Sequence, residues 1–141
     1  RDYFGPLMLQ HGDTDALIVG YSKNYRTVLR PVLEIIEKAK GVDKIASMMM
    51  ILSDKKPYFF ADTSINVNPT PEEMANIAKM AEFAIKSFAI QPRIAMLSYE
   101  NFSANSETSK KVAKAVNILL SVSKIKVATS AQTPPNISCL L

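Results

Sequence analysis

The chain has 141 residues, of which 48% are hydrophobic, 21% charged and 8% aromatic. This is the composition of an ordinary globular domain, and it excludes a disordered chain, which lacks the apolar residues needed to offset the entropy of ordering. The net charge is +4, from 17 basic and 13 acidic residues. Because the basic residues are interspersed with acidic ones, in no run longer than Lys55–Lys56 or Lys110–Lys111, we expect no nucleic acid as a partner.

The single cysteine, Cys139, excludes an internal disulfide framework and predicts a reducing, cytoplasmic environment. No stretch approaches the roughly 20 apolar residues needed to span a bilayer, and no signal segment opens the chain, so we expect no membrane partner. The chain begins at Arg1 and not at Met, which indicates a piece of a longer polypeptide or a processed chain.

The first part of the chain predicts two helices around a strand. Pro6 suits the first turn of a helix that ends at Gly12. The apolar run Ala16–Gly20 predicts a buried strand that enters a polar loop. A helical pattern follows over Tyr25–Lys40, and because Pro31 interrupts it, this helix either starts at Pro31 or is kinked there.

Two apolar runs, Lys44–Leu52 and Pro57–Asp62, are joined by a short polar turn and predict a β-hairpin. Three consecutive methionines lie in the first run, at positions 48 to 50, and indicate either core or a subunit interface. A strand at Ile94–Leu97 and a short last strand at Ile125–Val127 are also expected.

Two further helices have apolar stripes at helical spacing. The first begins at a capping box, in which the Thr70 side chain caps the helix and the Glu73 side chain accepts a hydrogen bond from the Thr70 backbone N–H. Its stripe comprises Met74, Ile77, Ala78, Ala81, Ala84, Ile85 and Phe88. The stripe of the second comprises Val112, Ala113, Val116, Leu119 and Leu120. The alternation of strands and helices predicts an α/β protein with a layered, mostly parallel sheet and an added antiparallel hairpin, followed by an irregular tail over 128–141.

Two polar loops follow predicted strands, at the positions where open α/β sheets bind ligands. The first loop contains Ser22, Asn24 and Tyr25, and the second contains Ser98, Asn101 and Ser103. Their hydroxyls and amides, each close to a helix N-terminus, suit a phosphate or an acyl oxyanion.

Three cations near the first loop, Lys23, Arg26 and Arg30, add positive charge that an anionic ligand would favour. The alternative is that both loops are solvated helix caps. In that reading Ser106 or Thr108 caps its own helix, and Arg30 pairs with Glu34 one turn further on. Spacing alone does not decide between the two.

Three more polar residues have simpler explanations. Asp62 ends an aromatic strand, where it acts as a base, orients a ligand or bonds the local backbone in a turn, the last being favoured. His11 lacks partners at metal-ligand spacing, which favours a helix-end hydrogen bond over a metal site. Cys139 has no nearby base and is taken as incidental.

At these same loops the chain resembles the phosphate acetyl/butyryltransferase family, and most of all the domain at the C-terminus of bacterial NADP-dependent malic enzymes. The segments that carry the resemblance lie in order from residue 1 to about residue 127: Tyr3–Gly5, Asp13–Gly20, Leu29–Ile36, Phe60–Asn66, Asn68–Glu73, Ile90–Ser98 and Asn101–Phe102.

The resemblance implies an α/β/α sandwich in two lobes, similar to isocitrate-dehydrogenase-like enzymes, that forms dimers. It implies that Arg30, with the loop from Ser22 to Tyr25 and the loop after Ser98, lines a cleft for phosphate or acetyl-coenzyme A. The transferases usually carry Ser and Thr where this chain has Asn24 and Tyr25. No cofactor is expected within this chain, whereas NADP and a divalent metal would belong to the remainder of a malic enzyme.

Three hypotheses follow from this resemblance. In the first, residues 1–127 are the central part of the acyltransferase-like domain of an NADP-dependent malic enzyme, which decarboxylates malate oxidatively, and this part binds an acyl-coenzyme A effector. In the second, the chain is part of a true phosphate acetyltransferase. In the third, it is a non-catalytic dimerisation module. In the first two, the chain alone is expected to be inactive, because the Ser-Arg pair and the acidic residue of the family's catalytic centre are absent.

Overall fold

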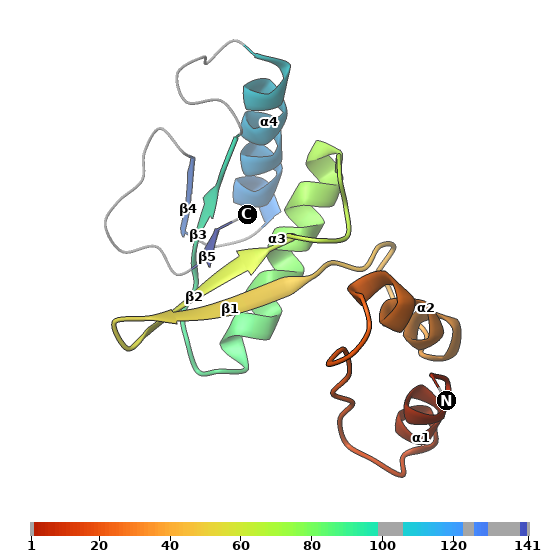
Figure 1. Ribbon diagram of the computed structural model, residues 1–141. Coiled ribbons are helices and arrows are strands. Elements are labelled where there is room, and N and C mark those ends of the chain that lie inside the picture. The colour runs from red at the N-terminus through yellow and green to blue at the C-terminus, as the bar shows by residue number, and fades with distance from the viewer. Residues whose placement is uncertain (1, 99–105, 123–125, 130–138, 141) are drawn as a thin grey trace. The chain divides into compact units, whose positions relative to one another are not determined.

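The computed structural model describes residues 2–98, 106–122, 126–129 and 139–140 (Figure 1). These residues form two compact units, one made of residues 1–45 and the other of residues 46–141. The predicted boundary at residue 127 stays a prediction. Each unit is described by itself.

The first unit contains helices α1, Phe4–His11, and α2, Tyr25–Ile35. α1 ends as predicted at Gly12, whose φ of 85° lies in the left-handed region that glycine tolerates. α2 begins at Tyr25, so the helix does not start at Pro31, which lies inside it. It ends at Ile35, short of the predicted end at Lys40.

The strand predicted at Ala16–Gly20 is wrong, because this segment is irregular and Ile18 is 96% exposed. A strand needs a neighbour for its backbone hydrogen bonds, and the described chain offers this segment none. Leu17 packs against α1 instead. Its Cδ1 lies 2.7 Å from the position that a Cβ on Gly5 would occupy, so a larger residue there would displace the Leu17 side chain.

The second unit contains one sheet of five strands in the order β1-β2-β5-β3-β4. The strands are β1, Met48–Ser53; β2, Lys56–Ala61; β3, Arg93–Met96; β4, Lys126–Thr129; and β5, Cys139–Leu140. β1 and β2 form the predicted antiparallel hairpin, and the other neighbours are parallel. Asp54 and Lys55 both have positive φ, the geometry that a two-residue hairpin turn requires.

The end of the chain differs from the irregular tail predicted for 128–141 at its described residues. Ala128 and Thr129 belong to β4, and Cys139 and Leu140 form β5, between β2 and β3. A two-residue strand carries almost no periodic signal, so its position depends on pairing with strands that are distant in the sequence.

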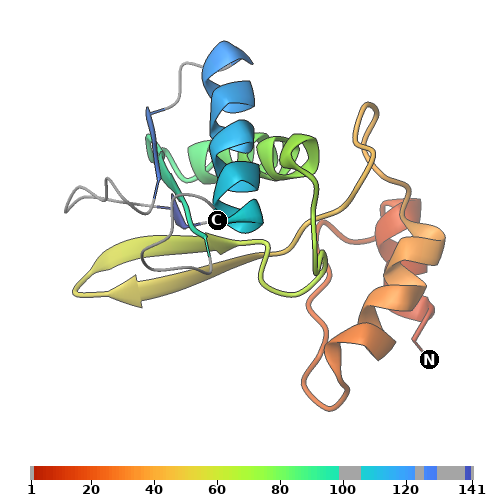
Figure 2. The ribbon, with the colours of Figure 1, turned by 90° about the horizontal axis from the view of Figure 1, so that it is seen from above.

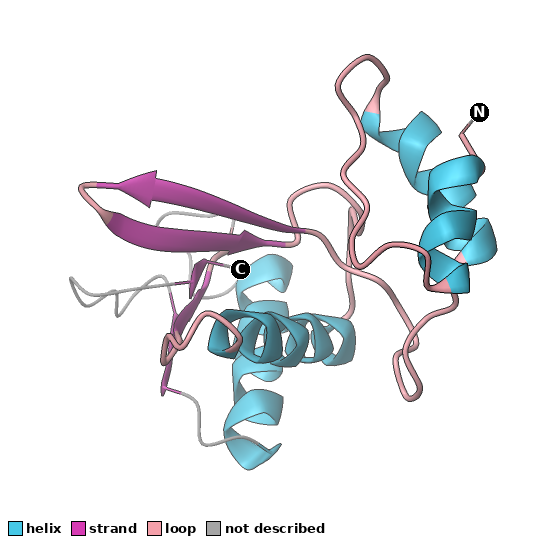
Figure 3. Cartoon of the chain, turned by 90° about the horizontal axis from the view of Figure 1, so that it is seen from below, coloured by secondary structure: helices cyan, strands magenta, loops and turns pink. Residues whose placement is uncertain are grey.

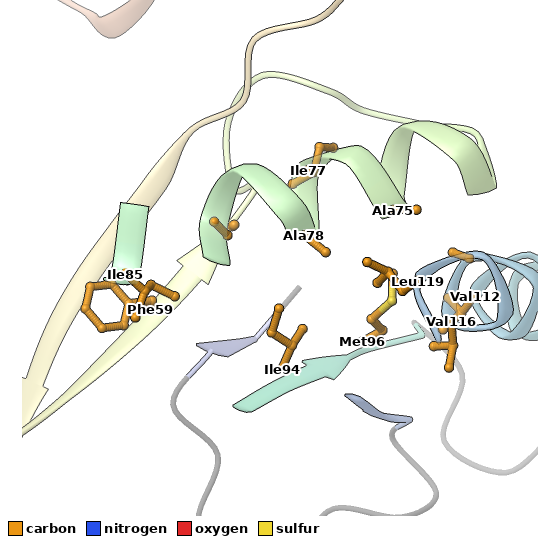
Figure 4. Packing of buried hydrophobic residues seen from close by; sticks show 13 residues of the cluster. Phe59, Ala75, Ile77, Ala78, Ile85, Ile94, Met96, Val112, Val116 and Leu119 are labelled. Carbon is orange, nitrogen blue, oxygen red and sulfur yellow. The ribbon is translucent and has the colours of Figure 1, made fainter. Parts of the chain in front are cut away.

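Helices α3, Pro71–Lys86, and α4, Glu107–Val122, pack against each other and lie over the sheet (Figures 2 and 3). The core forms where they meet β2 and β3 (Figure 4). Its buried residues are Phe59, Ala61, Ala75, Ile77, Ala78, Ala81, Ile85, Ile94, Met96, Val112, Ala115, Val116 and Leu119.

Both predicted helices are confirmed, but three residues of their predicted stripes are exposed, namely Phe88, Ala113 and Leu120. Phe88 lies beyond the end of α3, and Ala115 takes the place in the core of α4 that the sequence pattern assigned to Ala113. The methionines of β1 are exposed as well, so they are not core.

The α/β class is confirmed. Because α3 and α4 pack on each other, they share one face of the sheet, and the described residues of this unit show two layers. The three-layer sandwich and the isocitrate-dehydrogenase-like topology stay predictions. No helix in the described ranges is long and apolar enough to cross a membrane.

The capping box of α3 is present. Glu73 N donates to Thr70 Oγ1 at 3.2 Å, and Thr70 N donates to Glu73 Oε2 at 2.9 Å. We expect Thr70→Ala to lower the free energy of unfolding by ~1 kcal/mol, because an amide of the first turn loses its acceptor. Urea denaturation followed by circular dichroism measures this. The exposed helix residue Asn76 offers a control, and a Thr70→Ala change no more destabilising than Asn76→Ala would contradict the prediction.

Candidate functional site

The first predicted loop is built around the start of α2. Asn24 is the N-cap residue, and its Oδ1 accepts hydrogen bonds from Thr27 N at 3.0 Å and Thr27 Oγ1 at 2.7 Å. Tyr25 begins the helix, and Ser22 precedes the cap. The Asn24 side chain is therefore engaged in the helix cap, as in the capping alternative, while the loop as a whole stands beside the helix N-terminus.

Arg30 is exposed on α2 and pairs with Glu34, its Nε lying 2.8 Å from Oε1. Tyr3 Oη donates to the other oxygen of the same carboxylate at 2.6 Å. These bonds, from Tyr3 first and then from Arg30, lower the pKa of Glu34, and the bond to Glu34 raises the pKa of Arg30. The ion pair uses one of the five N–H groups of the guanidinium, so Arg30 keeps donors for an anion.

Lys23 pairs with Asp2, and this hydrogen bond lowers the pKa of the Asp2 carboxyl. The loop backbone between Val19 and Lys23 includes Gly20, whose φ of 113° lies in the region that favours glycine. The local turn therefore requires glycine before the polar residues of the loop. Lys23, although paired, also borders open space beside this loop.

Two cavities, of about 290 and 480 Å³, lie beside this loop, and both are lined by Val19, Gly20, Lys23, Val28 and Val32. Ser22 lines the smaller cavity, whereas Tyr25 lines the larger one. The larger volume falls in the range of small-molecule sites. Its mostly apolar wall with one cation suits a ligand that has an apolar part and an anionic group.

The lining role of Val28 and Val32 was missed in the sequence, where both are simply part of the helical pattern over Tyr25–Lys40. Both are half-buried and line the two cavities. The four-residue interval shows only that two residues share a helix face. Whether that face packs against protein or borders a cavity depends on what lies opposite.

The second predicted loop belongs to the second unit. Ser98 follows β3 and is half-buried, while Asn101 and Ser103 lie outside the described residues. Ser22, Asn24, Tyr25 and Arg30 all belong to the first unit, where Ser22 and Tyr25 line the two cavities and Asn24 and Arg30 line neither. That these residues share a cleft with Ser98 remains a prediction. Ser106 acts as a cap, since Ser109 N donates to its Oγ at 3.0 Å.

Asp62 follows β2 and is saturated with hydrogen bonds. Its Oδ1 accepts from Ser47 N at 2.9 Å, Ser47 Oγ at 2.8 Å and Ile65 N at 3.3 Å, and its Oδ2 accepts from Asn66 N at 2.8 Å and from the Asn66 side chain. Partial burial alone would raise the pKa of Asp62, but the bonds from Ser47 and Asn66 outweigh it, so this pKa is lowered.

A carboxylate with a lowered pKa and five donors around it is a poor proton acceptor. Of the roles considered for Asp62, turn chemistry is therefore the one that the geometry favours. The bonds extend beyond the turn, because Ser47 stands just before β1. Asp62 thus ties the start of the hairpin to the loop that follows it.

His11 lies in the last turn of α1, and its Nδ1 is 3.5 Å from Asp13 Oδ1. Both side chains are exposed. Within the described ranges, no three His, Cys, Asp or Glu side chains are grouped closely enough to hold a metal ion. The geometry of His11 is that of a helix-end contact.

Fold and loop arrangement together define an α/β domain with a ligand-sized cavity beside a helix N-terminus. Residues 1–128 match the family model described as phosphate acetyl/butaryl transferase. The chain belongs to this family.

Relatives with two kinds of activity are similar to the chain. The phosphate acetyltransferase of Bacillus subtilis is 36% identical over 84% of the chain and 37% of its own length. The NAD-dependent malic enzyme of Rhizobium meliloti is 36% identical over 82% of the chain and 15% of its own length. The NADP-dependent malic enzyme of Salmonella typhimurium is 37% identical over 77% of the chain and 14% of its own length. The chain therefore spans well under half the length of each of these relatives.

Solved phosphotransacetylase structures show the same fold. The EutD phosphotransacetylase of Staphylococcus aureus superposes with a TM-score of 0.78 at 23% identity, covering 99% of this chain and 49% of that one. A phosphotransacetylase of Streptococcus pyogenes superposes with a TM-score of 0.77 at 29% identity, covering 90% of this chain and 40% of that one.

Proposed function

We propose that this domain binds an acyl-coenzyme A through the loop Ser22–Tyr25 and Arg30. The observation that carries the proposal is the larger cavity, which has an apolar wall, Lys23 at its lining and the N-terminus of α2 beside it. An acyl-coenzyme A joins an apolar acyl and pantetheine portion to anionic phosphates. The acyl and pantetheine portion would occupy the cavity, and the cations and the helix N-terminus would attract the phosphates.

The role proposed for this binding is regulatory, in an NADP-dependent malic enzyme that decarboxylates malate oxidatively. Asn24 and Tyr25 support this, because they stand where the transferases usually carry Ser and Thr, and the Asn24 Oδ1 is engaged by Thr27. NADP and a divalent metal would then be bound by other parts of the enzyme. The reading frame that encodes the chain should carry a dinucleotide-binding malic enzyme domain on its N-terminal side, and its absence would contradict the assignment.

The second candidate is a part of a phosphate acetyltransferase, which forms acetyl phosphate and coenzyme A from acetyl-coenzyme A and phosphate. The similarity to the Bacillus subtilis enzyme, equal in identity to that of the Rhizobium meliloti malic enzyme, favours it. Because the chain alone is expected to be inactive in either case, incubating the full-length protein that contains it with acetyl-coenzyme A and phosphate separates the two. Binding without release of coenzyme A supports the regulatory role, whereas release of coenzyme A supports transfer.

Arg30→Ala is expected to weaken acetyl-coenzyme A binding about tenfold or more, because a charge-assisted hydrogen bond to phosphate is lost. Isothermal titration calorimetry of the 141-residue chain measures this. A matched control is Lys86→Ala, since Lys86 likewise pairs with a glutamate four residues away on its helix, Glu82 of α3, at 2.7 Å. Unchanged affinity in Arg30→Ala would remove Arg30 from the site, and no binding by the unaltered chain would contradict the proposal as a whole.

A further inference from the structure

Arg30, the residue proposed to bind the ligand phosphates, belongs to a three-residue cluster that joins the two helices of the first unit. Its Nε donates to Glu34 Oε1 at 2.8 Å, and Tyr3 Oη donates to Glu34 Oε2 at 2.6 Å. Tyr3 is the N-cap residue of α1, while Arg30 and Glu34 lie one turn apart on α2, and the two helices are in contact (Figure 1). Both oxygens of one carboxylate are thus held, each from a different helix.

The bond between Arg30 and Glu34 occupies only the Nε–H of the guanidinium. Of its five N–H donors, the other four lie on the two terminal nitrogens. Because the Arg30 side chain is 80% exposed, these terminal groups are accessible to an anion from solution. The pairing with Glu34 and a role in anion binding, which the sequence left as alternatives, are therefore compatible.

The Tyr3 hydroxyl distinguishes this cluster from an ordinary surface ion pair. An isolated pair on a helix surface orders its arginine weakly, because both long side chains readily leave it. Tyr3 holds the Glu34 carboxylate from a second helix, so Arg30 gains a fixed point of attachment. A long side chain that is already immobilised loses less conformational entropy when it binds a ligand.

We propose that Glu34 is a positioning residue for Arg30 and that Tyr3 in turn positions Glu34, so that the guanidinium presents its terminal N–H groups to a phosphate of the ligand. The inference rests on the proposed binding of an acyl-coenzyme A, and it adds two residues that do not themselves touch the ligand. Arg30 and Glu34 line neither of the two cavities, so they would serve a phosphate outside the cavity and not the acyl portion.

Charge alone and positioning predict opposite effects for the removal of Glu34. A carboxylate beside a phosphate site repels the phosphates, so its removal tightens binding if only charge matters. Positioning predicts weaker binding instead, because the ligand must then order the freed Arg30 side chain.

Isothermal titration calorimetry of the 141-residue chain with acetyl-coenzyme A tests the proposal. Glu34→Ala should raise the dissociation constant about two- to tenfold, the effect of having to order one long side chain on binding. Glu34→Gln should raise it less, since it removes the same charge but keeps an acceptor for Arg30 Nε. Tyr3→Phe changes no charge and should also weaken binding, by less than Glu34→Ala. The control is Glu37→Ala, at an exposed acid just beyond α2, which removes one negative charge and should not weaken binding.

A double-mutant cycle separates positioning from a purely structural role. In the Arg30→Ala background, Glu34→Ala should no longer weaken binding, because the side chain that Glu34 positions is gone. Equal weakening in both backgrounds, or unchanged or tighter binding in Glu34→Ala, would overturn the inference and leave the proposed function standing. If the unaltered chain binds no acetyl-coenzyme A, the proposed function and this inference fall together.

Nitrogen-15 relaxation of the Arg30 Nε–H group measures the order of the guanidinium on the picosecond-to-nanosecond timescale in the free chain. We expect an ordered Nε–H in the unaltered chain, reduced order in Tyr3→Phe, and in Glu34→Ala the mobility of Arg26, an exposed arginine one turn earlier on α2. Should Glu34→Ala fail to fold, Glu34→Gln and Tyr3→Phe replace it in both measurements. An Nε–H of Arg30 as mobile as that of Arg26 in the unaltered chain would overturn the inference, whatever the chain binds.

Discussion

Phe59→Ala is expected to lower the free energy of unfolding of the second unit by ~3–5 kcal/mol. Phe59 lies in the middle of β2 with none of its surface exposed, and its ring centroid is 5.8 Å from that of Phe88. Truncation removes buried apolar area and leaves a cavity next to Ile85, which the rigid strand and helix cannot fill (Figure 4). Since small domains are stable by only about 5–15 kcal/mol, much of the stability would be lost.

Urea denaturation of the variant and of the unaltered chain measures this loss. Phe83→Ala is the matched control, because the same side chain is removed from an exposed site on α3, and its expected effect is within about 0.5 kcal/mol. Phe59→Leu should fall between the two, since most of the cavity is filled again. A loss below about 1 kcal/mol in Phe59→Ala would mean that the core of this unit is not centred on Phe59.

Asp62→Ala is expected to destabilise the second unit by ~3 kcal/mol, because the donors of Ser47, Ile65 and Asn66 lose their shared acceptor. Ser47→Ala removes only the hydroxyl and should cost ~1 kcal/mol, since its backbone N–H keeps its bond to Asp62. Thr63→Ala, at the exposed neighbouring residue, is the control. Thermal unfolding at neutral pH should rank the three variants in this order, and equal effects of Asp62→Ala and Thr63→Ala would contradict the prediction.

The Asp62 carboxylate also makes the stability of the second unit depend on pH. Because the pKa of Asp62 is lowered in the folded protein, its contribution is fully present above the pKa of the unfolded carboxyl, near 4. It is lost as the pH falls through the lower, folded pKa. Asp62→Asn removes this titration, so its melting temperature should fall less than that of the unaltered chain between about pH 5 and pH 2. Parallel curves for the two proteins would show that Asp62 titrates alike in both states.

Local signals in the sequence predicted their elements well. Thr70 and Glu73 form the expected capping box, and the hairpin turns at the polar residues between its two apolar runs. These elements depend on contacts within a few residues, which a sequence pattern captures. Ala16–Gly20 depends on a partner strand instead, and the same apolar pattern therefore produced a wrong prediction there.

The candidate site was predictable in part. The residues from Ser22 to Arg30 were singled out by their place between an apolar run and a helix, and the structure puts Ser22 and Tyr25 at cavities. The pairing of Arg30 with Glu34 was one of the alternatives that the spacing left open. The cavities themselves were not predictable, because they arise where α1, the loop and α2 meet.

By itself, the sequence determined the family and the type of most elements, since ordered motifs and helical or alternating periodicity are properties of neighbouring residues. Only the tertiary structure decided which apolar residues became core and which stayed exposed. Phe59 and Met50 are directly opposite in the same hairpin, yet one is fully buried and the other lies on an open edge. The physical reason is that burial depends on what packs against a residue, and α3 covers β2 while nothing in the described sheet covers β1.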